Sequence, residues 1–289
     1  MAQINLFSDL GTIAQTVQDD AIFIIREATL MPNLVKVFTD MDGGNTRTGY
    51  QYNNGTAKER GEADDLTSDA FTPSADQVLT PINIGEQFFI TDLRARSEAP
   101  ESILTDAAQE LGFAAVSKVE TDLLGELANL TGGTIGAAGT VITWGYLAAA
   151  IAQARNANKN AAKPIAGVLH GYQWSVLAKA ATAAGATVAV APGFQDKMTN
   201  SGGMVKVFDF MGVPFYQVYA AADSADDFTG GIFPREAIAL DWRIPIHIAP
   251  ERDESRAGLE LNMHATYAHG VWRPARGVKM IFDATAPTS

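Results

Sequence analysis

The stretch from Thr48 to Gln77 constrains the fold more than any other part of the sequence. It carries few hydrophobic side chains, is dotted with glycine, and lies between two blocks with an apolar pattern. A connection longer than roughly 12–15 residues with no structure of its own is uncommon in a compact domain, where it signals either function or disorder. The residues on either side of the stretch decide between these two.

Both flanks have the period of two that is typical of β-strands. On the first side, the residues that alternate with polar neighbours or glycine are Thr46, Thr48, Tyr50 and Tyr52. On the far side, the pattern continues through Val78, Thr80, Ile82, Ile84, Phe88 and Ile90. Two such segments joined by a polar tip predict a long projecting β-hairpin rather than a disordered linker.

A two-stranded ribbon is marginally stable in water, so this hairpin needs another surface to lie against. A neighbouring subunit is the natural candidate for that surface. The residues that we expect to make the intersubunit contact are Tyr50, Tyr52, Lys58, Arg60 and Phe71.

The strongest helix in the sequence follows the hairpin. Pro100 and Glu101 begin it, as expected for a first turn at the positive end of the helix dipole, and Gly132 and Gly133 end it. Apolar residues recur every three or four positions from Leu104 to Leu130. About 30 residues with a rise of 1.5 Å per residue predict a helix roughly 45 Å long.

The remaining chain predicts a mixed body of helices and strands. We expect an amphipathic segment over residues 8–27, a strand over 34–38, and a turn at Asp40 to Asn45. After the long helix come a helix over 144–157 capped by Thr143, a strand over 165–170 and a helix over 171–183. Short strands follow, then a long half-buried strand over 257–268 and a terminal strand over 277–282.

Composition excludes several classes of function. The 33 acidic and 21 basic residues give a net charge of -12, which repels nucleic acid and disfavours a dedicated DNA or RNA binder. The absence of cysteine removes disulfides, thiolate metal sites and cysteine nucleophiles. With no signal-peptide pattern and no apolar run of about 18 residues, we expect a soluble protein inside a cell.

The sequence contains no motif that predicts catalysis, a cofactor or a metal ion. Its four histidines are best interpreted as structural, because His264 and His269 on one strand would face opposite sides. "DMDGGN" lacks the spacing of a calcium loop and predicts a β-turn. The acidic residues near the hairpin tip are interpreted as a solvated surface; they are Glu62, Asp64, Asp65 and Asp69.

The run "ERDESR" mixes both signs of charge and has two interpretations that the sequence does not separate. It is either an ion-pair patch between subunits or an exposed turn. The candidate intersubunit residues in it are Glu251, Arg252, Asp253, Glu254 and Arg256.

The order of these elements resembles the major capsid protein of tailed bacteriophages, which has the Hong Kong 97-type fold of the α+β class. "REATLMPNLVKVF" resembles the end of that family's N-arm and its first peripheral strand. The hairpin region resembles its extended loop, and "APESILTDAAQELGFAAVSKVETDLLGELANL" resembles its spine helix. The run from "KVFDFMGVPFYQV" to "GVKMI" resembles its closing strands.

The resemblance implies a division of the chain into four parts. These are an N-terminal arm over 1–35, a peripheral domain over 36–46 with 95–132 and 251–270 that includes the spine helix 100–131, an extended loop over 47–94, and an axial domain over 133–250 with 271–289. It implies no catalytic activity and no cofactor. Some members crosslink a loop lysine to a neighbour, and Lys58 is the candidate here, but we predict no such bond.

The resemblance further implies a homo-oligomer of hexamers and pentamers that forms an icosahedral shell around double-stranded DNA, with weak non-specific contact to it. It implies a separate scaffolding protein and a portal, allows a decoration protein, and excludes a membrane. The location would be the virion, after assembly in the cytoplasm of the bacterial host. The alternatives are an encapsulin-like compartment shell and a soluble α/β hydrolase or lyase that uses His247 or His264.

Overall fold

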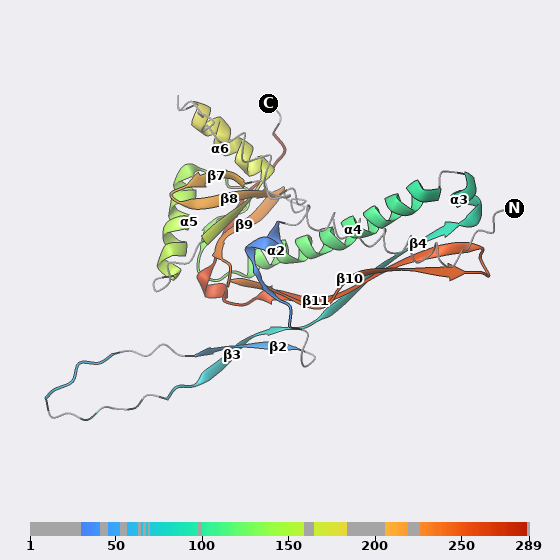
Figure 1. The fold of residues 1–289 in the computed structure, drawn as a ribbon. Helices are drawn as coiled ribbons and strands as arrows, with labels where there is room; N and C mark the ends of the chain where they lie inside the picture. Colours follow the sequence, from blue (N-terminus) through green and yellow to red (C-terminus); the bar gives the residue numbers. More distant parts are fainter. Residues whose placement is uncertain are drawn as a thin grey trace.

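The computed structural model describes residues 30–40, 46–52, 57–62, 65, 68, 70–97, 100–158, 165–183, 206–218 and 226–287. The amphipathic segment expected over 8–27 and most of the turn expected after Asp40 lie outside these residues. The described chain forms a compact body, a long arm of helix and sheet on one side of it, and a hairpin that projects the other way (Figure 1).

The arm is built on a four-stranded sheet in the order β1-β10-β11-β4. Its central pair, β10 (Ile238–Asp253) and β11 (Gly258–Val271), is antiparallel, and β4 (Ile82–Thr91) adds to β11, also antiparallel. The short strand β1 (Lys36–Phe38) pairs with β10 in parallel near the body. The helical turn α2 (Met31–Leu34) precedes β1. A short helix, α3 (Asp92–Ser97), follows β4 at the far end of the arm.

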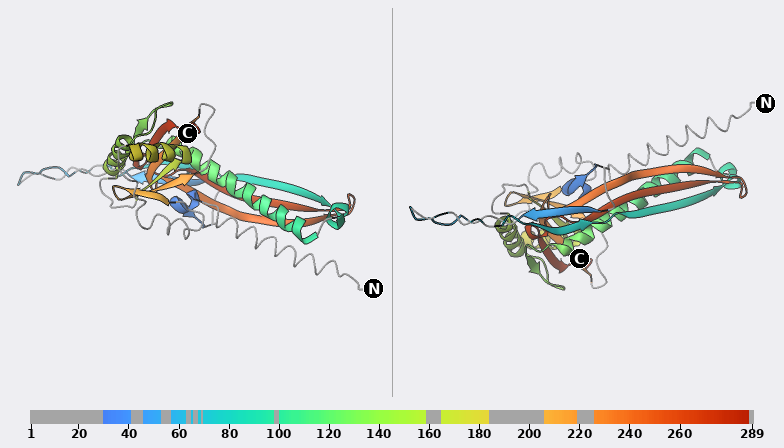
Figure 2. Two further views of the ribbon diagram at one scale, coloured as in Figure 1. Left: turned by 90° about the horizontal axis from the view of Figure 1, so that it is seen from above. Right: turned by 90° about the horizontal axis from the view of Figure 1, so that it is seen from below.

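The long helix α4 (Pro100–Gly125), extended by the 3₁₀ turn η1 (Glu126–Asn129), covers one face of this sheet. The two views in Figure 2 show the helix in front of the strands from one side and behind them from the other. Buried residues of α4 recur at helical spacing and pack on alternate residues of the strands, including Ile90, Ile248, Leu261 and Met263. Those on α4 include Ala108, Leu111 and Ala115.

The body contains a six-stranded sheet in the order β5-β12-β9-β6-β8-β7. The strands are β5 (Thr134–Gly136), β6 (Ile165–His170), β7 (Lys206–Phe210), β8 (Val213–Val218), β9 (Asp227–Pro234) and β12 (Val278–Asp283). Helix α5 (Trp144–Ala157) begins at Thr143, whose hydroxyl accepts the N–H of Tyr146. Helix α6 (Gly171–Ala183) follows β6 without a loop.

Gln173 fixes α6 to the end of the body sheet. Its side chain is fully buried, and its Nε2 donates to the carbonyls of Phe228 (3.1 Å) and Phe282 (2.9 Å), which are partners in the β9–β12 ladder. Its Oε1 accepts the N–H of His170 at 3.2 Å. One side chain therefore satisfies three backbone groups where a strand ends and a helix begins.

Sequence and structure agree on most elements and differ mainly at four places. The helices predicted at 144–157 and 171–183 and the strands predicted at 165–170 and near 257–268 and 277–282 are confirmed. The long helix was predicted to reach residue 131, but its α-helical part ends at Gly125. Leu34, predicted to lie in a strand, ends α2 instead, because Pro32 favours the first turn of a helix.

The third difference concerns the boundary of the hairpin. We predicted an extended loop over 47–94, but residues 82–91 form β4, which pairs with β11 and not with the hairpin. In the same way, residues 244–250, predicted as a short strand, and residues 238–243, assigned with them to the axial domain, belong to the continuous strand β10 of the arm sheet. In both cases the alternating pattern is correct, but it does not reveal which strand is the partner.

We expect Gln173→Leu to lower the free energy of unfolding by about 2 kcal/mol, because the change leaves buried backbone groups without their partner. Urea denaturation followed by circular dichroism measures the loss. The matched control is Ala180→Gln, an exposed position on the same helix, which should stay within about 0.5 kcal/mol of the wild type. Equal stability of the two variants would contradict the role given to Gln173.

Candidate functional site

The projecting hairpin is the candidate functional site. Strands β2 (Arg47–Tyr52) and β3 (Pro73–Leu79) pair antiparallel, from Arg47 opposite Leu79 to Tyr52 opposite Pro73, with a register shift after Gly49. The hairpin extends away from both the body and the arm (Figure 1). The described residues beyond its strands, including Lys58 and Arg60, are exposed.

Large aromatic side chains lie in water along this hairpin. Tyr50, Tyr52 and Phe71 are 57%, 51% and 73% exposed. The rings of Tyr52 and Phe71 stack with their centroids 4.6 Å apart and 3° between their planes, where the paired strands of the hairpin end. Val78, which the sequence identified only as a strand residue, is 54% exposed as well. Several large exposed apolar side chains on an otherwise polar projection are typical of a protein-binding surface.

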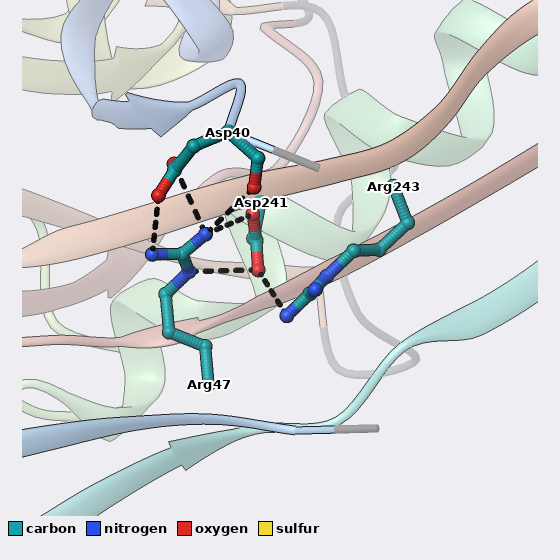
Figure 3. A network of polar contacts seen from close by, with 4 residues as sticks. All are labelled: Asp40, Arg47, Asp241 and Arg243. Atoms are coloured by element: carbon teal, nitrogen blue, oxygen red, sulfur yellow. Dashed lines mark hydrogen bonds and ion pairs between the residues drawn. The ribbon is translucent and has the colours of Figure 1, made fainter. Parts of the chain in front are cut away.

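The base of the hairpin is held by a network of ion pairs (Figure 3). Arg47 on β2 donates from Nε to Oδ2 of Asp241 on β10 at 2.9 Å, and from Nη2 to Oδ1 at 3.2 Å. The same guanidinium group binds both carboxylate oxygens of Asp40 at 3.0 and 3.2 Å. Nη2 of Arg243 lies 3.0 Å from Oδ2 of Asp241. Two arginines therefore converge on one aspartate.

Asp241 is the centre of this network. Its side chain has no exposed surface, and an ionised carboxylate is buried in proteins only when it is paired. Its hydrogen bond is the largest cause that raises the pKa of Arg47 above its usual value. Arg47 in turn lowers the pKa of Asp40 through its hydrogen bonds. Both shifts favour the charged forms of Arg47 and Asp40.

Close apolar packing supports the ion pairs. Leu79 at the end of β3 is buried with Ala239 and Ala268 of the arm sheet, beside Phe38 and Trp272. A Cβ on Gly49 would lie only 3.0 Å from the ring of Trp272, and one on Gly270 would lie 2.8 Å from Leu79. The absence of side chains at these two glycines lets the hairpin approach the sheet closely. The base is therefore seated firmly, while the distal half is exposed.

The sequence prediction missed this network, although one signal was present. Asp241 is the only charged residue in the run "AIALDW", and an acid within an apolar strand must find a partner when the strand is buried. That signal identifies the acid but not its partner, since Arg47 is 194 positions away.

The charged run predicted at 251–256 forms the opposite end of the molecule, at the turn between β10 and β11. Arg252 binds both carboxylate oxygens of Asp92 at 2.6 and 2.7 Å, and its Nε lies 3.2 Å from Glu254. Arg256 pairs with Glu260 at 3.2 Å and lies over the ring of Phe89. Both arginines thus have partners within their own chain.

Asp253 in the same turn also makes its hydrogen bonds within the turn. Asp253 accepts hydrogen bonds from the N–H and hydroxyl of Ser255 at 2.9 and 2.6 Å and from the N–H of Arg256, and the Ser255 hydroxyl is the largest cause that lowers its pKa. Glu251 is exposed. In the single chain the run forms the end of β10 and the turn that follows it.

The histidines do not gather into a site within the described chain. His247 and His264 are opposite each other on β10 and β11, and His269 lies 3.0 Å from Glu126 on the face beneath α4. In the part of the chain that the structure describes, no three histidine, aspartate or glutamate side chains are grouped to hold a metal ion. Among the same residues, no helix has the length and apolar character needed to cross a membrane.

We expect Asp241→Asn to destabilise the protein by about 3 kcal/mol, because it leaves two arginines at a partly buried site without their shared counter-ion. Urea denaturation checks the size of the loss. Asp40→Asn removes the exposed partner of the same Arg47 and should have a much smaller effect. If the two variants were equally stable, Asp241 would not be the centre of the network.

Comparison with known proteins places the fold. No family model matches the sequence, and no curated protein matches it. The capsid of Ralstonia phage GP4 has a TM-score of 0.66 and 9% identity, over 91% of this chain and 93% of that chain. A structure from Mycobacterium phage Che8 has a TM-score of 0.65 and 15% identity, over 90% and 92%.

A virus-like particle from Pyrococcus furiosus is similar as well, with a TM-score of 0.57 and 10% identity over 94% of this chain and 98% of that chain. The similarities cover both the body and the arm, because they extend over nine-tenths of the chain. The chain therefore has the Hong Kong 97-type fold of the capsid proteins of tailed phages, as its sequence predicted.

Proposed function

We propose that this chain is the major capsid protein of a tailed bacteriophage, which assembles in many copies into an icosahedral shell around double-stranded DNA. The observation that carries the proposal is the hairpin, whose aromatic surface is exposed in the single chain although its base is fixed by buried ion pairs. A rigid projection with an uncovered apolar surface fits a contact with a second copy. The fold shared with phage capsid proteins supports the same function.

The hairpin lies, in this proposal, across the adjacent subunit of a hexamer or pentamer. Tyr50, Tyr52 and Phe71 supply the apolar contact, and Lys58 and Arg60 supply polar contacts near the tip. Aromatic and arginine side chains are enriched in such interfaces, and the aromatic rings bury a large area with few rotatable bonds. The stacked pair of Tyr52 and Phe71 is already ordered in the single chain, which lowers the entropic cost of docking.

The charged turn at the other end of the molecule is the second proposed contact between subunits. Its arginines are paired within the chain, so a neighbour would meet a closed set of ion pairs rather than free charges. Such a surface contributes more to orientation than to affinity. In this proposal Glu251 and Glu254 provide exposed acidic groups at the contact, together with Arg252, Asp253 and Arg256.

The remaining parts of the proposal follow the same family. Residues 1–35 serve as the N-terminal arm of the family. The four-stranded sheet together with α4 serves as the peripheral domain, and the body with its six-stranded sheet serves as the axial domain. The protein is structural and not an enzyme. It acts in the virion after assembly in the host cytoplasm, with a separate scaffolding protein and a portal as partners and room for a decoration protein. The net charge of -12 keeps contact with the packaged DNA weak.

The proposal is tested by shortening the hairpin without disturbing its base. Replacing residues 53–72 with Asn-Gly joins Tyr52 to Pro73, which are already partners in the ladder, through a favoured two-residue turn. We expect the purified variant to keep its circular dichroism spectrum but to elute as small species, whereas the wild type forms closed shells visible by negative-stain microscopy. Closed shells of normal size from the variant would overturn the proposed role of the hairpin.

Substituting the exposed aromatic residues tests whether assembly needs their side-chain contacts and not only the length of the hairpin. The triple change of Tyr50, Tyr52 and Phe71 to serine should reduce shell formation at least tenfold, because it removes apolar area and little else. Lys58→Ala is the matched control and should assemble normally. Boiled wild-type particles should run as single chains in a denaturing gel, since we predict no crosslink through Lys58. A chain that stays a monomer or dimer under all conditions would count against a shell protein altogether.

A further inference from the structure

One carboxylate on α4 holds the chain that leads into β1. The N–H of Met31, the first residue of α2, donates to both carboxylate oxygens of Glu120, at 3.2 Å to Oε1 and 3.0 Å to Oε2. The residue before α2, Leu30, makes no side-chain cap, so Glu120 supplies from α4 the acceptor that a capping side chain normally provides. The two partners are 89 residues apart in sequence.

The surroundings of this contact are apolar. Leu30, Met31 and Val35 are buried against Val119, Leu123 and Leu124, the neighbours of Glu120 on α4. Burial disfavours an ionised carboxylate, and it raises the pKa of Glu120 to about 7, although hydrogen bonds from the backbone of Met31 and Leu30 act in the opposite direction. The Glu120 carboxyl group thus accepts a hydrogen bond in an apolar environment that disfavours its ionised form.

The charged groups on the adjoining described elements are otherwise engaged. Helix α2 itself has no titratable side chain. Lys36 on β1 lies over the rings of Phe38 and Trp272, and Nε of Arg235 donates to the carbonyl of Val35 at 2.9 Å. Lys118 and Asp122, which flank Glu120 on α4, pair with each other at 2.6 Å, and Asp122 also accepts the hydroxyl of Tyr267 on β11. His269 on β11 lies 3.0 Å from Glu126 and 3.7 Å from Asp122.

We propose that Glu120 and the first turn of α2 form a proton-dependent clasp, which holds the chain before β1 on α4 more tightly when the carboxyl is protonated than when it is ionised. The neutral acid still offers its carbonyl oxygen to the N–H of Met31, and it escapes the cost of a buried charge. When α2 detaches, Glu120 meets water and regains an ordinary affinity for protons.

The sign of the pH dependence follows from linkage. The clasped form binds a proton up to about pH 7, whereas the open form releases it near the usual value of 4.5. The stabilisation is therefore fully present below pH 4.5 and is lost as the pH rises through 7. Between pH 6 and pH 8 the population of the open form should rise about tenfold. The clasp acts in the single chain and does not rest on the proposed assembly.

Hydrogen exchange of the unassembled wild-type chain tests the clasp. After correction for intrinsic exchange, the amides of residues 31–38 should lose protection about tenfold between pH 6 and pH 8, while those of β11 should not. Glu120→Gln, which mimics the neutral acid, should keep the protection at pH 8. The matched control is Glu110→Gln, an exposed position on the same helix, which should behave like the wild type.

A direct titration provides the second measurement. The side-chain carboxyl carbon of Glu120, followed by NMR in the wild type, should titrate with a midpoint near 7. A midpoint near 4.5, or protection of residues 31–38 that does not change between pH 6 and pH 8, would overturn the proposal. Since the titration uses the wild type, it decides the question even if Glu120→Gln does not fold.

Discussion

The buried carboxylate of Asp241 is the constraint on which the projecting hairpin depends. A two-stranded ribbon cannot stabilise itself, so its direction must be fixed at its base. Asp241 does this because a carboxylate without solvent contact needs cationic partners, and Arg47 from the hairpin is one of the two that reach it. Apolar packing of Leu79 and the approach allowed by Gly49 then exclude water from the contact. The base of the hairpin is attached to the sheet for this reason.

Fixing the base changes what the exposed aromatic side chains can do. On a flexible loop, Tyr52 and Phe71 would lose much conformational entropy when they bind a partner. On a ribbon held at one end they are presented in a defined direction, already stacked on each other. The same surface is a liability if no partner arrives, because exposed apolar area promotes association without specificity. Under the proposed function the partner is another copy of the same chain, which is abundant during assembly.

The sequence predicted elements well where the signal was local. The alternation in 257–268 and the helical spacing from Leu104 to Leu130 arise from one buried face, and each is visible without knowledge of the partner. The boundary between hairpin and arm was not visible, because the period of two continues from Val78 to Ile90 with a break only at Glu86, while β3 and β4 pair with different strands. Pairing between distant strands is a property of the whole fold, and the pattern within one strand does not carry it.

The same distinction explains the site. Tyr50, Tyr52 and Phe71 were predicted as contact residues because they lie on the expected hairpin, and their rings are exposed in the single chain. Arg47 and Asp241 were missed because their importance arises only when residues 194 positions apart meet. Glu120 shows the rule again, since nothing in "KVETD" distinguishes it from the exposed acids of α4 until α2 packs over it. In this chain the buried charges mark the long-range contacts. They are the places where the hairpin and the segment before β1 are attached to an otherwise apolar frame of helix and sheet.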